Sequence, residues 1–469
     1  MRDYKLIING EKVDGKKSSI DVINPANETV YSKCPNASAE QLDDAVNAAS
    51  IAFQSWGNTS HEDRKKLLNL VADKVEENSA ELAQIIVAEQ GKPISLANIE
   101  VGAGIAWIRY TASLDIPVQI LEDSDDRVVE MHRKPLGVVA SITPWNWPFM
   151  IAIWHIIPAL RAGNTMVCKP SIDTPLNTIR LVEIMNEVLP KGVINVITAA
   201  SGIGSAMTKH KGIRKIVFTG STQTGKTIMA DASDTLKRLT LELGGNDAGI
   251  VLPNSENLDQ IAQGVFQTSF FNMGQTCAAL KRLYVHADQY DELCEKLVSI
   301  ANSQIIGDGI DEDVTFGPLT NQAQLDLVSQ LVEDARKNGG KILCGGKRLN
   351  KKGYFYEPTI ISDVDNSFRV VNEEQFGPIL PVVKYNTIEE AIKMANDSKE
   401  GLGGSVWGDK TKAKDIALKL ECGTSWINKH AEVLPHVPFG GSKLSGIGIE
   451  FGQEGLLEFT QVQILNFSK

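Results

Sequence analysis

From about residue 136 onward, short β-rich runs alternate with helical patterns, and this rhythm strongly limits the possible folds. Strand-like runs occupy 137–142, 165–168, 193–197 and 215–218, and a second series begins near Ile250. A strand, a helix and a further strand in this order imply parallel pairing. The 469 residues are therefore predicted to form two doubly wound α/β domains in succession.

Local patterns predict individual helix ends and one ribbon. Ser38 followed by Gln41 three residues later is a capping-box pattern. Thr174, immediately before Pro175, is predicted to cap the helix that follows the run at 165–168. The segment 127–133, R-V-V-E-M-H-R, alternates in the manner of a β-strand.

Composition limits the partners, the cellular location and the kinds of site that we expect for this chain. Lys and Arg number 47 against 58 Asp and Glu, a net charge of −11, so nucleic acid is not an expected partner. No two of the six cysteines have C-x-x-C spacing, so we expect free thiols, a cytoplasmic protein and no metal site. The N-terminus is too polar for a signal peptide, and the most apolar run, 150–160, contains His155 and Pro158, so we expect no membrane span.

Two short segments carry candidate reactive groups. Cys277 lies in G-Q-T-C-A at 274–278, and its thiolate would be a nucleophile; a buried, inert thiol is the alternative. Glu242 ends an apolar run just before a double glycine. Burial there would raise its pKa toward the range of a general base, whereas a strand-edge glutamate facing solvent is the alternative.

Two loops after predicted strands are candidate binding elements. Asn146 lies in T-P-W-N-W-P at 143–148, where a rigidly held amide could stabilise an oxyanion or could simply complete a packed turn. The segment F-T-G-S-T-Q-T-G at 218–225 opens a helix, and its amides could face a pyrophosphate. It lacks the G-x-G-x-x-G fingerprint, and glycine in such a turn can be purely steric.

Taken together and in order, these segments resemble the aldehyde dehydrogenase family. The resemblance extends from Asn24 to the strand near Val462. Its seven motifs are P-W-N-W-P at 144–148, K-P-S at 169–171, F-T-G-S at 218–221, L-E-L-G-G at 241–245, G-Q-T-C at 274–277, E-Q-F-G-P at 374–378 and P-F-G-G at 438–441.

The resemblance implies covalent catalysis. Cys277 would attack the aldehyde, Asn146 and the backbone amide of Cys277 would hold the oxyanion, and Glu242 would activate water to release a carboxylic acid from the thioester. The implied cofactor is NAD or NADP. The implied cofactor-binding residues are Trp145, Lys169, Gly220, Ser221, Gly225, Glu374 and Phe376.

Three positions depart from the family pattern. Ile172 replaces a common glutamate that accepts both ribose hydroxyls, so NADP use is open while NAD stays preferred. His155 replaces a common lysine on an implied proton path with Glu450. Because histidine titrates near pH 6.5, we expect deacylation to depend more on pH near neutrality than in relatives with lysine, unless His155 is simply a buried side chain with one hydrogen bond. Asn246 has no functional explanation.

The resemblance also implies a substrate pocket of apolar and aromatic side chains. Neutral aliphatic or aromatic aldehydes are therefore the expected substrates. The pocket positions are Trp147, Met150, Trp154, Phe271, Thr276, Val433 and Phe439.

By the same resemblance, a Rossmann-like NAD(P)-binding domain covers 1–112 and 136–244, and a catalytic domain covers 245–444. The segments 113–135 and 460–469 would form a small β bridging piece in a homodimer or homotetramer. Two alternatives stay open: a CoA-acylating aldehyde dehydrogenase, although those relatives usually lack the counterpart of Glu242, and a non-catalytic protein on the same fold.

Overall fold

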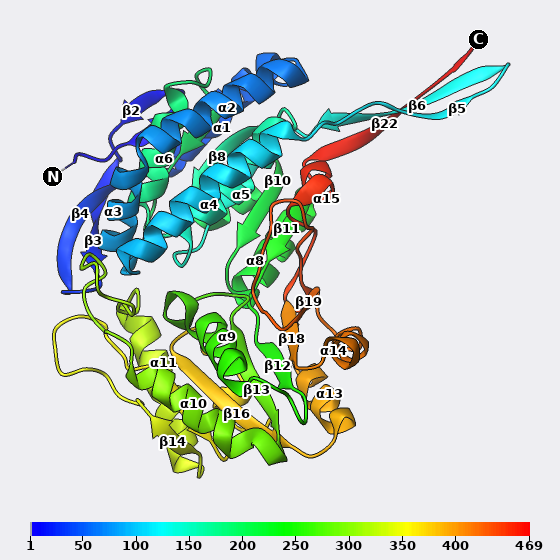
Figure 1. The fold of residues 1–469 in the computed structure, drawn as a ribbon. Helices are drawn as coiled ribbons and strands as arrows, with labels where there is room; N and C mark the ends of the chain where they lie inside the picture. Colours follow the sequence, from blue (N-terminus) through cyan, green and yellow to red (C-terminus); the bar gives the residue numbers. More distant parts are fainter. Residues whose placement is uncertain (1) are drawn as a thin grey trace.

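The computed structural model describes residues 2–469, and two large twisted sheets form its centre (Figure 1). The first sheet has eight strands, of which the five central ones are parallel. In spatial order they are β2 (Glu11–Val13), β1 (Leu6–Ile8), β9 (Ile194–Val196), β8 (Thr165–Lys169), β7 (Val138–Ile142), β10 (Ile213–Thr219), β11 (Arg238–Glu242) and β21 (Gly446–Ile447).

The order of these strands fixes where a ligand can bind. The chain runs from β7 through β8 to β9 on one side and then returns to β10 and β11 on the other. Reversal of this kind opens a crevice outside the carboxyl ends of β7 and β10. The loops that follow these two strands carry Asn146 and Ser221 respectively.

Helices cover both faces of the first sheet because successive strand residues point to opposite faces. Val139 of β7 packs against α2–α6, whereas Val138 and Ala140 pack against α1, α7 and α8. The helices are α1 (Ala39–Trp56), α2 (His61–Glu77), α3 (Ser79–Gln90), α4 (Ile94–Ser113), α5 (Pro148–Arg161), α6 (Leu176–Asn186), α7 (Ile203–Lys209) and α8 (Thr222–Ala232).

One predicted helix cap is confirmed and one is wrong. Ser38 and Gln41 form the expected capping box at the start of α1. Thr174 does not cap α6; the carboxylate of Glu89, on α3, accepts hydrogen bonds from the backbone N–H groups of Leu176 and Asn177 instead. A carboxylate from a neighbouring helix thus replaces the local hydroxyl, since it satisfies two free N–H groups at once.

The second sheet has seven strands, of which all but the edge strand β14 are parallel. In order they are β14 (Lys341–Cys344), β15 (Thr359–Ser362), β16 (Ile379–Tyr385), β13 (Leu280–His286), β12 (Asp247–Val251), β18 (Gly403–Trp407) and β19 (Thr424–Ile427). Its helices are α9 (Leu258–Phe270), α10 (Tyr290–Asn302), α11 (Gln322–Lys337), α12 (Arg369–Asn372), α13 (Ile388–Asn396) and α14 (Lys410–Ala417).

A three-stranded ribbon projects from the body and carries the C-terminus at its tip (Figure 1). It consists of β5 (Gln119–Asp123), β6 (Arg127–Pro135) and β22 (Thr460–Ser468). The alternating run 127–133 therefore lies in a strand, as predicted. Smaller elements are β3 (Lys17–Asn24), β4 (Thr29–Asn36), β17 (Glu400–Gly401), β20 (Ser442–Lys443) and α15 (Gly452–Leu457).

The fold class is the predicted one: two doubly wound α/β units and a small β extension. Over residues 2–469, no helix combines the length and the apolar character that a membrane crossing requires.

Candidate active site

The candidate site lies where the carboxyl edge of the first sheet meets the amino edge of the second. Only four residues separate the end of β11 from the start of β12, and Cys277 precedes β13, the neighbour of β12. A cavity of about 260 Å³ opens between these edges. Its lining includes Trp145, Asn146, Gly220, Ser221, Cys277, Glu374 and Phe376, which were all predicted site residues.

Cys277 follows a tightly wound turn. Asn272, Met273 and Gly274 are all left-handed, with φ of 52°, 54° and 73°. Gly245 must be a glycine because a Cβ there would clash with the carbonyl oxygen of Cys277. Burial, followed by the nearby carboxylates of which Glu374 contributes most, raises the pKa of the Cys277 thiol. The thiol is therefore protonated at neutral pH before ligands bind.

Asn146 is buried and held from both sides. Its Nδ2 donates to the carbonyl oxygen of Gln275 at 3.0 Å, two residues before Cys277. This bond uses one of the two amide protons, so the second is available to the cavity. The predicted oxyanion donor thus lies beside the predicted nucleophile.

Glu242 is the last residue of β11 and is 5% exposed. Both of its carboxylate oxygens are buried, and neither bonds to a protein group of residues 2–469. Burial, and then the neighbouring carboxylate of Glu450, raise the pKa of Glu242 well above its ordinary value. The alternative of a solvent-facing glutamate is therefore wrong.

His155 does not titrate near neutrality, contrary to the expectation from its ordinary pKa. It is fully buried, and burial together with the positive charge of Lys215 lowers its pKa to about 3. Its Nδ1 lies 2.9 Å from Ser141 Oγ, and its Nε2 lies 3.0 Å from Thr219 Oγ1 and 3.5 Å from Glu450. His155 is thus a neutral, hydrogen-bonded neighbour of Glu450.

Some of the residues predicted to bind the cofactor line this cavity, and others lie outside its lining. Trp145 and Phe376 both line the cavity and pack edge to face, with ring centres 5.3 Å apart. Glu374 Oε1 accepts the N–H of Gly245 at 3.0 Å. Ser221 caps α8 by accepting the N–H of Thr224.

Three further positions lie outside the cavity lining. Gly225 packs beneath Leu243, where a Cβ would clash. Lys169 ends β8, and its Nζ donates to the carbonyl of Pro170 at 3.3 Å. Ile172, the position that departs from the family pattern, is 37% exposed.

Aromatic side chains predicted for the substrate pocket lie on the other side of Cys277. Trp147 and Phe271 pack with ring centres 4.9 Å apart, and Trp147 Nε1 donates to Thr276 Oγ1 at 2.9 Å. Trp154 and Phe439 both pack on Phe451. Met150 is half-buried at the start of α5, and Val433 packs at the edge of the same core.

Two aromatic members of this cluster, Trp107 and Phe451, were not predicted from the sequence. Trp107 of α4 lies 5.7 Å from both Trp154 and Phe451, measured between ring centres. The i, i+4 spacing of Ala103 and Trp107 on one helix face was the available signal, but it is equally typical of ordinary core packing.

Comparison with known proteins places the chain in a family. A model of the aldehyde dehydrogenase family matches residues 12–465. The chain is 38% identical to an aldehyde dehydrogenase from a Fusarium species, covering 98% of each chain. It is also 38% identical to a mitochondrial aldehyde dehydrogenase from Leishmania tarentolae, over 99% of this chain and 95% of that one.

Solved structures of similar proteins lead to the same family. An NAD+ complex of a Bacillus cereus aldehyde dehydrogenase superimposes with a TM-score of 0.97 at 36% identity, covering 100% of this chain and 97% of the other. A Staphylococcus aureus betaine aldehyde dehydrogenase with NAD+ gives 0.96 at 35% identity, covering 99% and 97%. Fold and relatives thus define an oxidoreductase. The chain belongs to the aldehyde dehydrogenase family.

Proposed function

We propose that the protein oxidises neutral aldehydes to carboxylic acids, with NAD as the preferred hydride acceptor and Cys277 as the nucleophile. The observation that carries this proposal is one cavity edge shared by Cys277, the amide of Asn146 and Glu374, with the unbonded carboxylate of Glu242 on the adjoining strand end.

The cavity fits a nicotinamide nucleotide. The rings of Trp145 and Phe376 supply an apolar part of its wall, and the start of α8 presents backbone N–H groups beside Ser221, which suits a pyrophosphate. Two relatives of known structure were solved with NAD+. The neutral, half-exposed Ile172 neither repels nor recruits a 2′-phosphate, so NADP use stays a prediction.

The chemistry follows from the side chains around Cys277. The thiol first loses its proton to water, because the thiolate is the nucleophilic form. The thiolate sulfur then adds to the aldehyde carbon, and the new oxyanion accepts hydrogen bonds from the free Asn146 amide proton and the Cys277 N–H. When bound, NAD supplies the acceptor for the hydride that leaves this carbon. What stays on Cys277 is a thioester.

Glu242 acts as the general base in hydrolysis of the thioester. Its raised pKa makes it a stronger base than an exposed glutamate once ionised, and its unbonded oxygens can accept a proton from water. Water then adds to the thioester carbonyl and the acid leaves, regenerating the thiol. This favours hydrolysis over acyl transfer to CoA, which would not need such a base.

The substrate class follows from the aromatic cluster that packs beside Cys277. Trp147, Trp154 and Phe439 are buried or half-buried and pack against Phe271 and Phe451. None of these side chains carries a charge. An aldehyde with a charged tail would lose its hydration there without gaining a partner, so neutral aliphatic or aromatic aldehydes are favoured.

Stopped-flow measurement of reduced nicotinamide at 340 nm tests this function. Hexanal and benzaldehyde with NAD should give a burst and steady turnover, whereas Cys277→Ser should give neither. Betaine aldehyde and succinate semialdehyde should react at least tenfold more slowly in kcat/KM. Turnover that requires CoA and releases acyl-CoA would contradict the hydrolytic route, and absence of any first-turnover signal would favour a non-catalytic protein.

Some expectations stay predictions. They are the domain boundaries (1–112 with 136–244, 245–444, and 113–135 with 460–469), a homodimer or homotetramer, and a cytoplasmic location. The ribbon leaves apolar side chains such as Leu121, Ile464 and Phe467 exposed, which supports its use between subunits.

A further inference from the structure

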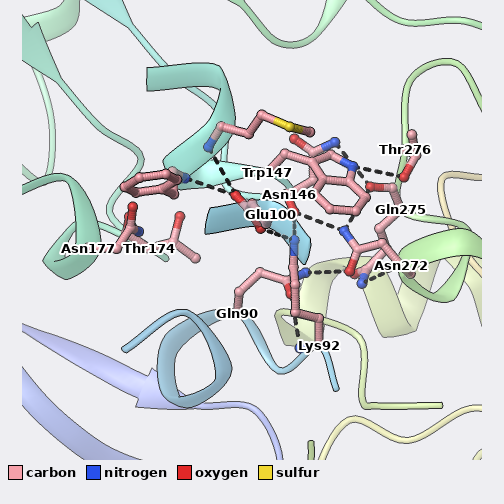
Figure 2. Close-up of polar contacts among 12 residues, drawn as sticks. Gln90, Lys92, Glu100, Asn146, Trp147, Thr174, Asn177, Asn272, Gln275 and Thr276 are labelled. Atoms are coloured by element: carbon pink, nitrogen blue, oxygen red, sulfur yellow. Dashed lines mark hydrogen bonds and ion pairs between the residues drawn. The ribbon is translucent and has the colours of Figure 1, made fainter. Parts of the chain in front are cut away.

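Lys92, which no family motif above includes, is completely buried and contacts the loop that carries Asn146 (Figure 2). It lies in the turn between α3 and α4. Its Nζ forms an ion pair with Glu100 and donates to the main-chain carbonyl of Asn146 at 3.0 Å. The same nitrogen lies 3.6 Å from the centre of the Trp147 ring. One cation therefore contacts two consecutive residues of the site loop.

The partner of Lys92 is fixed in turn. Glu100 Oε2 pairs with Lys92, while Oε1 accepts the backbone N–H groups of Phe149 and Met150 at 3.0 and 3.1 Å. These are free N–H groups at the start of α5, which has no side-chain cap of its own. Glu100 thus connects α4, the lysine and the first turn of the helix that follows the Asn146 loop.

The carbonyl of Asn146 is also held from the nucleophile side. Asn272 Nδ2 donates to it at 2.8 Å, and Gln90 Nε2 donates to Asn272 Oδ1 at 3.2 Å (Figure 2). With its carbonyl bound by two donors and one amide proton bound to Gln275, Asn146 has a single free donor direction. The two loops that form the oxyanion site are therefore joined through Asn146.

We propose that Lys92 is a positioning residue that aims the Asn146 amide at the oxyanion, with Glu100 holding its ammonium in place. The proposal rests on the proposed function, because it assigns a task to Asn146 in that reaction. A buried ion pair gives little net stability over an apolar pair of the same size. Here the ammonium of Lys92 orients both the main-chain carbonyl of Asn146 and the indole ring of Trp147.

The variant that tests this removes both charges together. Lys92→Met alone would leave Glu100 buried and unpaired, which is strongly destabilising. In Lys92→Met/Glu100→Gln, the Gln side-chain oxygen can still accept the N–H groups of α5. We expect the burst of reduced nicotinamide to slow about 30- to 300-fold, since loss or misplacement of one oxyanion donor has effects of this order.

Two further measurements separate positioning from a damaged site. The NAD dissociation constant should change less than twofold, and alkylation of Cys277 by iodoacetamide, which forms no oxyanion, should change less than threefold. In an Asn146→Ala background the same pair of substitutions should slow the burst no further, because residues that act through one another are non-additive.

A second variant keeps the ion pair intact. Asn272→Gly removes the other donor to the Asn146 carbonyl, and glycine accepts the φ of 52° at this position. It should slow the burst at least tenfold and be non-additive with Asn146→Ala.

A wild-type burst rate in either variant, or losses that multiply in the Asn146→Ala background, overturns the proposal. So does alkylation that slows in parallel with the burst. A wild-type protein with no burst instead contradicts the proposed function.

Discussion

Two buried polar clusters flank Cys277, and they differ in how their hydrogen bonds are used. The Lys92 cluster (Lys92, Glu100, Asn146 and Asn272) is closely bonded within itself. The Glu242 cluster (Glu242, Glu450, His155 and Lys215) contains three carboxylate oxygens that bond to no protein group of residues 2–469.

The difference separates two tasks. A satisfied network rigidifies the groups it contains, which suits a donor that must point in one direction. An unsatisfied buried carboxylate is costly, but it can still bond to water and take a proton. We infer that geometry is set on the first side of Cys277 and proton transfer on the second.

The largest effect is expected from a substitution in the Glu242 cluster alone. Glu242→Gln should reduce steady turnover about 1,000-fold, because water must then attack the thioester without a base. The burst of reduced nicotinamide should keep an amplitude near one per site, since the first half of the reaction does not use Glu242. Stopped-flow and steady-state absorbance at 340 nm measure the two halves, and loss of the burst amplitude would contradict the division of tasks.

A smaller effect concerns pH. Because the pKa of Glu242 is raised, its basic form is scarce at low pH, and hydrolysis-limited turnover should rise as pH increases. Glu450→Gln removes one cause of that shift, so the midpoint of this rise should move to lower pH. His155→Gln is the matched control: His155 is neutral above pH 3 to 4, so its loss should leave the midpoint in place. A flat profile would refute the role of the carboxylate pair.

The smallest expected effect is on stability, and its sign differs between the unbonded carboxylate of Glu242 and the bonded carboxylate of Glu89, which caps α6. Glu242→Gln removes a buried carboxylate without a partner and should stabilise the protein by about 1 kcal/mol at alkaline pH, where that carboxylate is ionised. Glu89→Ala removes the acceptor for two N–H groups of α6 and should destabilise it by about 1–2 kcal/mol. Thermal unfolding followed by circular dichroism compares the two variants. Stability changes of the same sign would show that the hydrogen bonding of a buried carboxylate does not determine its effect on stability.

Local features of the sequence could be predicted well. The strands of both sheets follow runs of β-branched residues, and Ser38 with Gln41 forms the capping box that their spacing indicates. The site loops follow parallel strands, so the meeting of Asn146 and Ser221 at one sheet edge follows from topology alone.

Features that depend on distant partners could not be predicted. Thr174 has the chemistry of a cap, but Glu89, 87 positions before Leu176, occupies that place. The ordinary pKa of His155 is irrelevant once folding removes water from it. Lys92 follows a helix-ending glycine, and nothing local indicates that its ammonium reaches Asn146, 54 residues away.

Side chains from other helices cap the first turns of α5 and α6, and this affects how the site forms during folding. Neither helix has a side-chain cap of its own; Glu100 of α4 and Glu89 of α3 close their first turns. A partly folded chain that lacks α3 and α4 in their places would therefore have frayed starts to both helices, beside the loops of Asn146 and Lys169. The arrangement around Asn146 therefore depends on α3 and α4 being docked, although neither helix contributes a side chain to the cavity beside Cys277.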